Sequence, residues 1–177
     1  MLHGMISWAV RFLKSPRDIG AVAPSSPFLG RLMTRDIKPH ARVLELGPGT
    51  GAVTSHILSR VPASQLTVVE RDEDLCVECA TRFPNTRICP GDAEELLQNE
   101  NETYDVIVSG LPFAIMDERK RTRLFRLIVD RLTPTGHFVM FQYSTTTLAE
   151  LKTIFGSVDV RFTLWNLPPA FVFVARR

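Results

Sequence analysis

Three alternating glycines follow a β-prone run: Gly47, Gly49 and Gly51 come directly after residues 42–46. Glycine lets a backbone approach a ligand closely, because it adopts conformations that other side chains forbid. In open parallel sheets, ligands bind at the carboxyl ends of strands, so we expect a ligand site at this turn. The run also fits the dinucleotide pattern G-x-G-x-x-A through Ala52, and therefore does not by itself choose between nucleoside cofactors.

Three further strand ends carry residues that suit a nucleoside ligand. Glu70 lies 23 residues after Gly47, where a carboxylate can accept hydrogen bonds from both ribose hydroxyls. Asp92 could accept the adenine amino group, although a helix N-cap explains it equally well. Residues 109–113 close a fourth strand and face the reacting end of a ligand lying across the sheet, unless they form a simple turn. The candidate binding residues are Glu45, Gly47, Gly49, Thr50, Gly51, Glu70, Arg71, Asp92, Ala93, Ser109, Gly110 and Leu111.

Alternating strands and helices position these residues. We predict strands over residues 42–46, 66–70, 86–89, 104–109, 137–143, 158–164 and 170–174. Helices are predicted over about 52–60, 72–83, 93–98, 117–132 and 147–155, with residues 133–136 ending the longest of them. Such alternation implies βαβ units around a parallel sheet. The last two strands have no room for a crossover helix and should be antiparallel, which predicts a three-layer α/β fold with a mostly parallel sheet.

Residues 1–41 are predicted to form a separate helical segment, and residues 42–177 the ligand-binding domain. At helical spacing, residues 2–14 place apolar side chains on one face, with Arg11 and Lys14 opposite and Trp8 at the border. This amphipathic helix either contacts a membrane or covers the ligand site. Ser26 before Pro27 predicts the N-cap of a second helix, which we expect to reach about residue 36.

Composition narrows the class of protein. With 177 residues, 45% hydrophobic and 23% charged, the chain suits one soluble domain with a single core. Its apolar runs are far shorter than the roughly 20 residues that a membrane span needs. Three cysteines make no disulfide framework, which indicates a reducing cytosol. Residues 1–43 hold seven basic and two acidic residues, which suits an anionic surface, either membrane or nucleic acid, if the bias is not chance.

The remaining reactive residues suggest no second chemistry. Cys76 and Cys79 form one CxxC inside a predicted helix, whereas a zinc site usually needs four ligands, so we interpret them as buried thiols and expect no metal. The basic residues between 119 and 126 are interpreted as the solvated face of a helix, which could also meet an anionic surface.

The four strand ends together resemble the class I S-adenosylmethionine-dependent methyltransferase pattern over residues 42–143. Glu45 and the glycines resemble its first motif and Glu70 its ribose-binding acid. Gly91-Asp92-Ala93 resembles the adenine-side motif, and Ser109 to Phe113 the fourth motif. The resemblance implies a Rossmann-like methyltransferase sheet and S-adenosyl-L-methionine as the cofactor.

A narrower resemblance, to the bacterial phospholipid N-methyltransferases, extends over almost the whole chain. It rests on Ile19-Gly-Ala-Val-Ala-Pro-Ser-Ser26, Leu44-Glu-Leu-Gly-Pro-Gly-Thr-Gly51, Ser109-Gly-Leu-Pro112, Phe141-Gln-Tyr-Ser144 and Trp165-Asn-Leu-Pro-Pro-Ala170. That family methylates phosphatidylethanolamine stepwise to phosphatidylcholine as a peripheral membrane enzyme. The resemblance implies phospholipid and an anionic membrane surface as partners, without nucleic acid. It also implies a cytoplasmic enzyme, expected to be monomeric, at the inner face of the cell membrane.

For methyl transfer to an amine, Tyr143 is the candidate catalytic residue, because its phenol could orient the neutral amine or pass on its proton. Phe113 and Tyr143 could also hold the methylated ammonium through cation–π contacts, and Pro112 completes the predicted substrate-binding set. Ordinary packing at strand ends explains both aromatic residues equally well.

Two other functions stay open. The run Leu111-Pro112-Phe113 resembles the Asn-Leu-Pro-aromatic run of the rRNA adenine dimethylases, which makes an RNA adenine N-methyltransferase the alternative. Gly110 has no side chain to accept hydrogen bonds from an exocyclic amine, which lowers this alternative. A non-catalytic module that binds the cofactor or a membrane ranks last, because neither the glycine turn nor Glu70 departs from the pattern.

Overall fold

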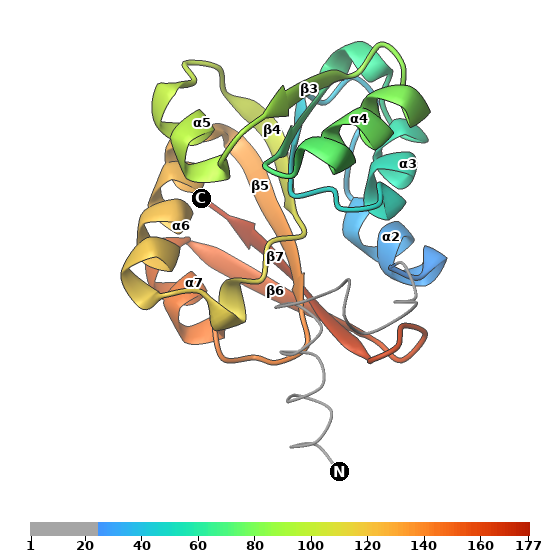
Figure 1. The fold of residues 1–177 in the computed structure, drawn as a ribbon. Helices are drawn as coiled ribbons and strands as arrows, with labels where there is room; N and C mark the ends of the chain where they lie inside the picture. Colours follow the sequence, from blue (N-terminus) through green and yellow to red (C-terminus); the bar gives the residue numbers. More distant parts are fainter. Residues whose placement is uncertain (1–24) are drawn as a thin grey trace.

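The computed structural model describes residues 25–177, which form a seven-stranded sheet between two layers of helices (Figure 1). The strand order is β3-β2-β1-β4-β5-β7-β6. Only β7 runs against the others, between β5 and β6. The predicted three-layer, mostly parallel sheet with an antiparallel C-terminal strand is confirmed. The strands are β1 (Val43–Leu46), β2 (Leu66–Glu70), β3 (Arg87–Pro90), β4 (Tyr104–Ser109), β5 (Leu132–Gln142), β6 (Ser157–Thr163) and β7 (Ala170–Arg176).

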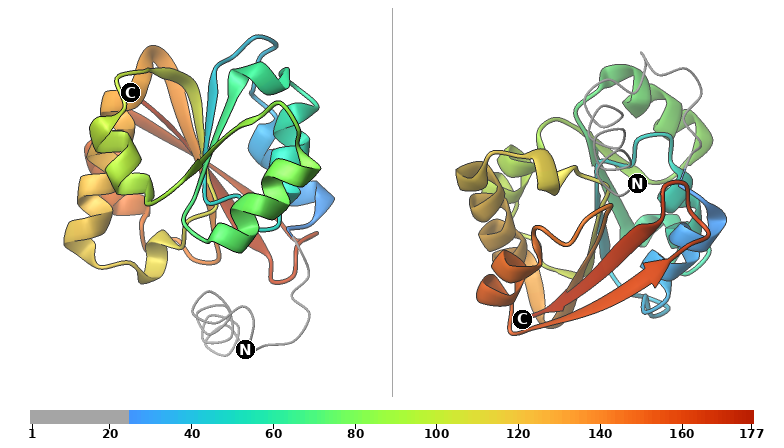
Figure 2. Two further views of the ribbon diagram at one scale, coloured as in Figure 1. Left: turned by 45° about the horizontal axis from the view of Figure 1, so that its top comes forward. Right: turned by 90° about the horizontal axis from the view of Figure 1, so that it is seen from below.

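The helices of residues 25–177 lie on both faces of the sheet, as both views in Figure 2 show. Helices α2 (Pro27–Thr34), α3 (Ala52–Leu58) and α4 (Glu73–Arg82) cover one face. Helices α5 (Ala93–Asn99), α6 (Glu118–Arg131) and α7 (Leu148–Ile154) cover the other. The amphipathic helix predicted over residues 2–14 lies outside the described residues.

Each face of the sheet has its own core. Successive strand residues point to opposite faces, so that Val43 packs with α2 and α3 while Leu44 packs with α6. The α6 side is aromatic, with Phe113, Phe125 and Phe138 fully buried in one cluster. Burying one such side chain stabilises a fold by about 1.5–3 kcal/mol. The sheet is therefore held rigidly, and its strand ends are fixed relative to one another.

Polar caps fix where four helices begin. The Ser26 side chain accepts a hydrogen bond from the Leu29 amide, which confirms the predicted cap of α2, although α2 ends at Thr34 rather than near 36. Asp72, Asp92 and Asp117 cap α4, α5 and α6 in the same way. Each cap contributes about 1 kcal/mol. The caps of α4 and α5 follow directly after β2 and β3, so they also fix the loops at those strand ends.

The prediction of a loop over residues 133–136 is wrong. Helix α6 passes directly into β5, which begins at Leu132 and includes these residues. The pairing with β4 jumps from Tyr104–Leu132 to Val106–His137, so the extra residues form an irregularity within the strand. The Thr133 hydroxyl donates to the Asp105 carboxylate at 3.2 Å, which holds this bulge against β4.

Candidate active site

A pocket of about 660 Å³ opens at the carboxyl ends of β1, β2, β4 and β5. Its volume lies within the range of about 300–1,000 Å³ that is typical of small-molecule sites. Most of the residues singled out in the sequence line it. They are Glu45, Gly47, Gly49, Thr50, Glu70, Arg71, Asp92, Ala93, Gly110, Leu111, Pro112 and Tyr143.

The glycine turn forms one wall of the pocket. Gly47, Gly49 and Gly51 all have positive φ angles, between 55° and 74°, which strongly favours glycine. A Cβ atom at Gly49 would meet nothing within 4 Å, so the backbone here faces open space. Gly51 does not line the pocket, so its role as a binding residue stays a prediction. Its Cβ would lie 2.5 Å from the Phe83 ring, so its role is to allow the turn to pack against that ring.

Glu70 stands at the corner between the glycine turn and β2. It is largely buried, and its carboxylate accepts hydrogen bonds from the amides of Arg71 (2.9 Å), Asp72 (3.1 Å) and Gly49 (3.3 Å). These bonds fix the carboxylate at the pocket wall and tie the end of β2 to the glycine turn. A charged acceptor held in this way suits the hydroxyl donors of a sugar.

Glu45 also lines the pocket but is only 1% exposed. Its Oε2 atom has no hydrogen-bond partner among the described residues. Burial, together with the negative charge of Glu70, raises the pKa of Glu45 to about 7, although the neighbouring Thr54 acts in the opposite direction. An unpartnered buried carboxyl oxygen is costly, and a cationic or hydrogen-bonding ligand in the pocket would satisfy it.

Asp92 both caps α5 and faces the pocket. Its carboxylate accepts from the Glu94 amide at 2.7 Å and pairs with the Lys120 ammonium at 3.3 Å. Burial alone would raise the pKa of Asp92, but these two partners hold it below its usual value. The cap interpretation is therefore confirmed, and the same side chain still lines the pocket.

The segment after β4 forms the opposite wall. A Cβ at Gly110 would lie 2.5 Å from the carbonyl oxygen of Gly47, so only glycine lets β4 end this close to the glycine turn. Ser109 is fully buried and does not line the pocket, so its role as a binding residue stays a prediction. Its hydroxyl accepts from the Leu111 amide at 3.1 Å and thereby shapes the turn from behind.

The prediction that Phe113 contacts substrate is wrong. Its ring has no exposed surface and packs 4.7 Å from Phe125 and 6.0 Å from Phe138, between centroids. The side chain therefore points into the core rather than into the pocket. The alternative interpretation, packing at a strand end, holds for this residue.

Tyr143 lies at the far end of the pocket, just after β5, and packs edge-on against Phe141 with ring centroids 5.7 Å apart. Burial raises the pKa of its phenol, and the neighbouring Asn166 amide opposes this shift. Asn166 itself accepts from the Ser26 amide at 3.0 Å and donates to the Pro168 carbonyl at 2.8 Å. The phenol is therefore protonated at neutral pH and lies beside the Asn166 amide of the β6–β7 turn.

Comparison with known proteins gives the family. A family described as a methyltransferase domain matches residues 43–136. The ornithine lipid N-methyltransferase of Singulisphaera acidiphila is 34% identical, over 94% of this chain and 92% of that protein. The chain belongs to the class I S-adenosylmethionine-dependent methyltransferases.

Two further proteins, one similar in sequence and one similar in structure, show how far the similarity extends. A dimethyladenosine transferase of Schizosaccharomyces pombe is 28% identical over 73% of the chain, which spans only 42% of that longer protein. The solved 1,6-didemethyltoxoflavin-N1-methyltransferase of Burkholderia thailandensis superposes with a TM-score of 0.74, covering 98% of this chain and 87% of that one at 18% identity. The expected Rossmann-like methyltransferase fold is thereby confirmed.

S-adenosyl-L-methionine is the cofactor of this methyltransferase, and the pocket residues fit it. The cofactor is a cation that carries ribose and adenine. The buried Glu45 oxygen lacks a partner that a cation would provide, and the Glu70 carboxylate stands ready for hydroxyl donors. The open space at Gly49 leaves room for close backbone approach.

Two residues that shape this site, Lys120 in its lining and Gln142 behind it, were not singled out in the sequence analysis. Lys120 lines the pocket beside Asp92, although it belongs to the basic run that we interpreted as a solvated face. Gln142, almost fully buried, accepts from the Ala114 amide and donates to the Leu111 carbonyl, both at 3.1 Å. A glutamine between strand residues has no distinctive spacing. Its signals were its place next to Tyr143 and its part in the run Phe141-Gln-Tyr-Ser144, which carries the family resemblance.

The predicted buried thiols brace the same loops. Cys76 and Cys79 are buried on α4, and the Cys76 thiol donates to the Glu70 carbonyl at 3.2 Å. Burial raises the pKa of Cys79 to about 11, so this thiol is unreactive at neutral pH. Within residues 25–177, no group of three or more His, Cys, Asp and Glu side chains is placed to hold a metal ion.

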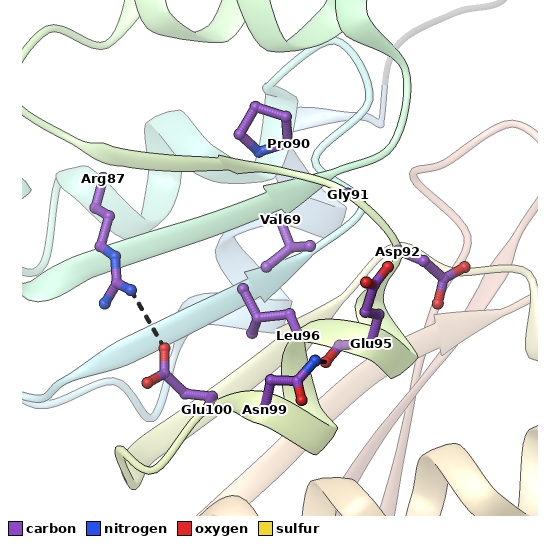
Figure 3. Close-up of a pocket in the computed structure, with 9 residues that line it drawn as sticks. All are labelled: Val69, Arg87, Pro90, Gly91, Asp92, Glu95, Leu96, Asn99 and Glu100. Atoms are coloured by element: carbon purple, nitrogen blue, oxygen red, sulfur yellow. Dashed lines mark hydrogen bonds and ion pairs between the residues drawn. The ribbon is translucent and has the colours of Figure 1, made fainter.

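A smaller pocket of about 340 Å³ adjoins the main one between β3 and α5 (Figure 3). Gly91 and Asp92 line both, so the small pocket continues the side of the site where we expect adenine. At its far end, Arg87 pairs with Glu100 at 3.4 Å. This ion pair occupies the far end, and we assign the small pocket no separate chemistry.

Proposed function

We propose that this methyltransferase N-methylates the amine of a membrane lipid, and that phosphatidylethanolamine and its mono- and dimethyl forms are converted toward phosphatidylcholine. One observation carries the proposal: the end-to-end match to a protein named for methylating ornithine lipid on nitrogen. Phosphatidylethanolamine and ornithine lipid share an amine on a lipid scaffold. The lipid amine is therefore the class of acceptor, and the head group is the point to test.

The pocket supports this chemistry. S-adenosylmethionine supplies a methyl group on its sulfonium for in-line displacement by a neutral amine, so the chain must align the amine and exclude water. Tyr143 lines the pocket, and its phenol oxygen can accept a hydrogen bond from an amine N–H. Met116, Leu124 and Phe141 line the pocket with apolar surface, which limits access of water.

Access to a lipid requires contact with a membrane surface. Among residues 25–177, no helix is long and apolar enough to cross a bilayer. We therefore propose peripheral association with the inner face of the cell membrane, with the basic N-terminal residues and an anionic leaflet attracting each other. About 1 kcal/mol per basic residue near such a surface is a typical gain.

RNA adenine methylation is the competing function. Relatives named dimethyladenosine transferase match this chain, but it spans only 42% of the Schizosaccharomyces pombe protein. Gly110 stands where the rRNA enzymes carry an amide or carboxylate, and its contact with Gly47 leaves no room for a side chain. Both points favour a lipid amine over RNA adenine as the methyl acceptor.

The test offers methyl-labelled S-adenosylmethionine with vesicles that contain phosphatidylethanolamine, ornithine lipid or neither, followed by mass spectrometry of the extracted lipids. We expect methyl groups on the phosphatidylethanolamine nitrogen. Methylation of ornithine lipid alone would keep the lipid amine as acceptor and replace the head group. If both lipids stay unmethylated by a chain that binds the cofactor, the proposal is overturned.

A further inference from the structure

Four large apolar side chains are exposed together where β6 turns into β7. Leu164, Trp165 and Leu167 are 71%, 72% and 77% exposed, and Phe28 at the start of α2 is 51% exposed. The rings of Phe28 and Trp165 lie 5.7 Å apart, so the four form one patch, here called the apolar tip. Large apolar side chains clustered on a surface mark a contact with a partner, whereas single ones need no explanation.

The apolar tip adjoins the mouth of the pocket. Asn166, between Trp165 and Leu167, is only 7% exposed and lines the pocket, as does Ser25 just before α2. The Ser26 amide donates to Asn166, which joins α2 to the turn. Figures 1 and 2 both show the β6–β7 turn beside the start of α2. One turn thus presents apolar side chains outward and a polar side chain to the site.

The charges around the apolar tip suit an anionic lipid surface. From Leu164 to Ala175 the chain carries no charged residue, so this turn bears no carboxylate that would repel such a surface. Arg31 is exposed one helical turn from Phe28, on the same side of α2. Tryptophan favours the boundary between lipid and water, because its ring is apolar and its N–H is polar.

We propose that the apolar tip inserts into the head-group region of an anionic bilayer and holds the pocket mouth against the lipid. The proposal rests on the proposed function for the reason to dock there, but the insertion itself needs only a lipid surface. It is separate from the predicted helix over residues 2–14. It predicts that Trp165 enters the lipid while Asn166, in the same turn, keeps its place at the pocket.

Trp165 can report on its own insertion. The chain has two tryptophans, so Trp8→Phe leaves Trp165 as the single tryptophan emitter. The probe is vesicles of phosphatidylglycerol and phosphatidylcholine, with and without bromine on the acyl chains. We expect the emission to shift to shorter wavelength on vesicles and to be quenched by the brominated lipid. Emission that is unchanged and unquenched, while the protein is bound to vesicles, would overturn the proposal.

A double variant separates docking from catalysis. Trp165→Ser with Leu167→Ser removes the outermost side chains, and Val77→Ser, at a 67% exposed valine on α4, is the matched control. We expect vesicle binding and methylation of vesicle lipid to fall by about tenfold or more in the double variant only. Cofactor affinity and methylation of a water-soluble short-chain lipid should stay within about twofold. Equal loss in the control, or none in the double variant, would contradict docking through the tip.

Other occupants of the apolar tip give distinct results. If another part of the chain or a second copy covers the tip, the emission of Trp165 is already at shorter wavelength in buffer and does not change when vesicles are added. That result overturns the proposal. If the protein binds vesicles with Trp165 quenched but methylates no lipid, the docking stands and the proposed function fails. The two inferences are therefore tested independently.

Discussion

Glu45 and Glu70 are neighbouring carboxylates in one pocket, yet their surroundings differ sharply. Glu70 accepts three backbone hydrogen bonds, whereas Glu45 has a buried oxygen with no partner among the described residues. The sequence predicted where both carboxylates lie, from the glycine turn and the end of the second strand. It did not predict that only Glu70 receives backbone hydrogen bonds, because the positions of the amide donors depend on how the loops fold.

Replacing Glu45 by Gln should make stability less dependent on pH in the absence of cofactor. Burial raises the pKa of Glu45 from 4.5 to about 7, so the folded state holds the proton more tightly than the unfolded state. The stabilising contribution is fully present below pH 4.5 and is lost as the pH rises through about 7.

Urea unfolding at about pH 5 and about pH 9 tests the predicted loss of stability with rising pH. Relative to the native chain, Glu45→Gln should gain up to roughly 3 kcal/mol at the higher pH, since one pKa unit corresponds to about 1.4 kcal/mol. The same variant should bind S-adenosylmethionine more weakly, because the negative partner for a cation is gone. A difference in stability between the variant and the native chain that is the same at both pH values would refute this assignment.

Glu70→Ala should weaken cofactor binding by about ten- to a hundredfold. A hydrogen bond to a charged group contributes about 1.5–3 kcal/mol, and the Gly49 amide also loses its acceptor. Titration calorimetry with S-adenosylmethionine measures the change. Glu78→Ala, at an exposed carboxylate of α4, is the control and should bind as the native chain does. Native affinity in Glu70→Ala would exclude the ribose-binding role.

Tyr143→Phe should keep the packing against Phe141 and lose only the phenol oxygen. If that oxygen orients the amine or passes on its proton, kcat should fall by about a hundredfold with cofactor affinity unchanged. Steady-state kinetics with saturating lipid gives kcat. An unchanged kcat would assign Tyr143 to packing alone.

At the scale of elements, the sequence predicted most strands and helices because hydrophobic periodicity and caps agree locally. Strands β2 and β4 begin and end at the predicted residues. The loop predicted over residues 133–136 was wrong. Threonine, proline and glycine are typical of a turn, but here these residues belong to β5, which pairs with β4. The expected substrate contact of Phe113 was wrong for a similar reason, because only the folded aromatic cluster shows that its ring faces inward.

Gln142 links two elements, the end of β5 and the segment after β4. Gln142→Leu leaves the Ala114 amide and the Leu111 carbonyl without their partner. We expect the free energy of unfolding to fall by about 1–3 kcal/mol and KM for the lipid to rise more than the Kd for cofactor. Urea unfolding and acceptor kinetics measure both. Equal changes in KM and Kd would mean that Gln142 supports the whole pocket rather than this wall.

At the scale of the whole molecule, the topology collects strand ends from distant parts of the chain at one edge. That collection was predictable, since parallel strands share their carboxyl edge. The acceptor was not predictable from the fold, because a 1,6-didemethyltoxoflavin-N1-methyltransferase superposes on this chain with a TM-score of 0.74. The apolar tip was not predicted either, because exposure depends on what the folded chain leaves uncovered.

We propose that this pocket delivers a methyl group to a lipid amine. A single-turnover reaction tests it most directly: the full chain is loaded with methyl-labelled S-adenosylmethionine and mixed with phosphatidylethanolamine vesicles or with ribosomal RNA. Label should enter the extracted lipid and not the RNA. Label that enters RNA while the lipid stays unlabelled would contradict the account and establish the adenine methyltransferase in its place.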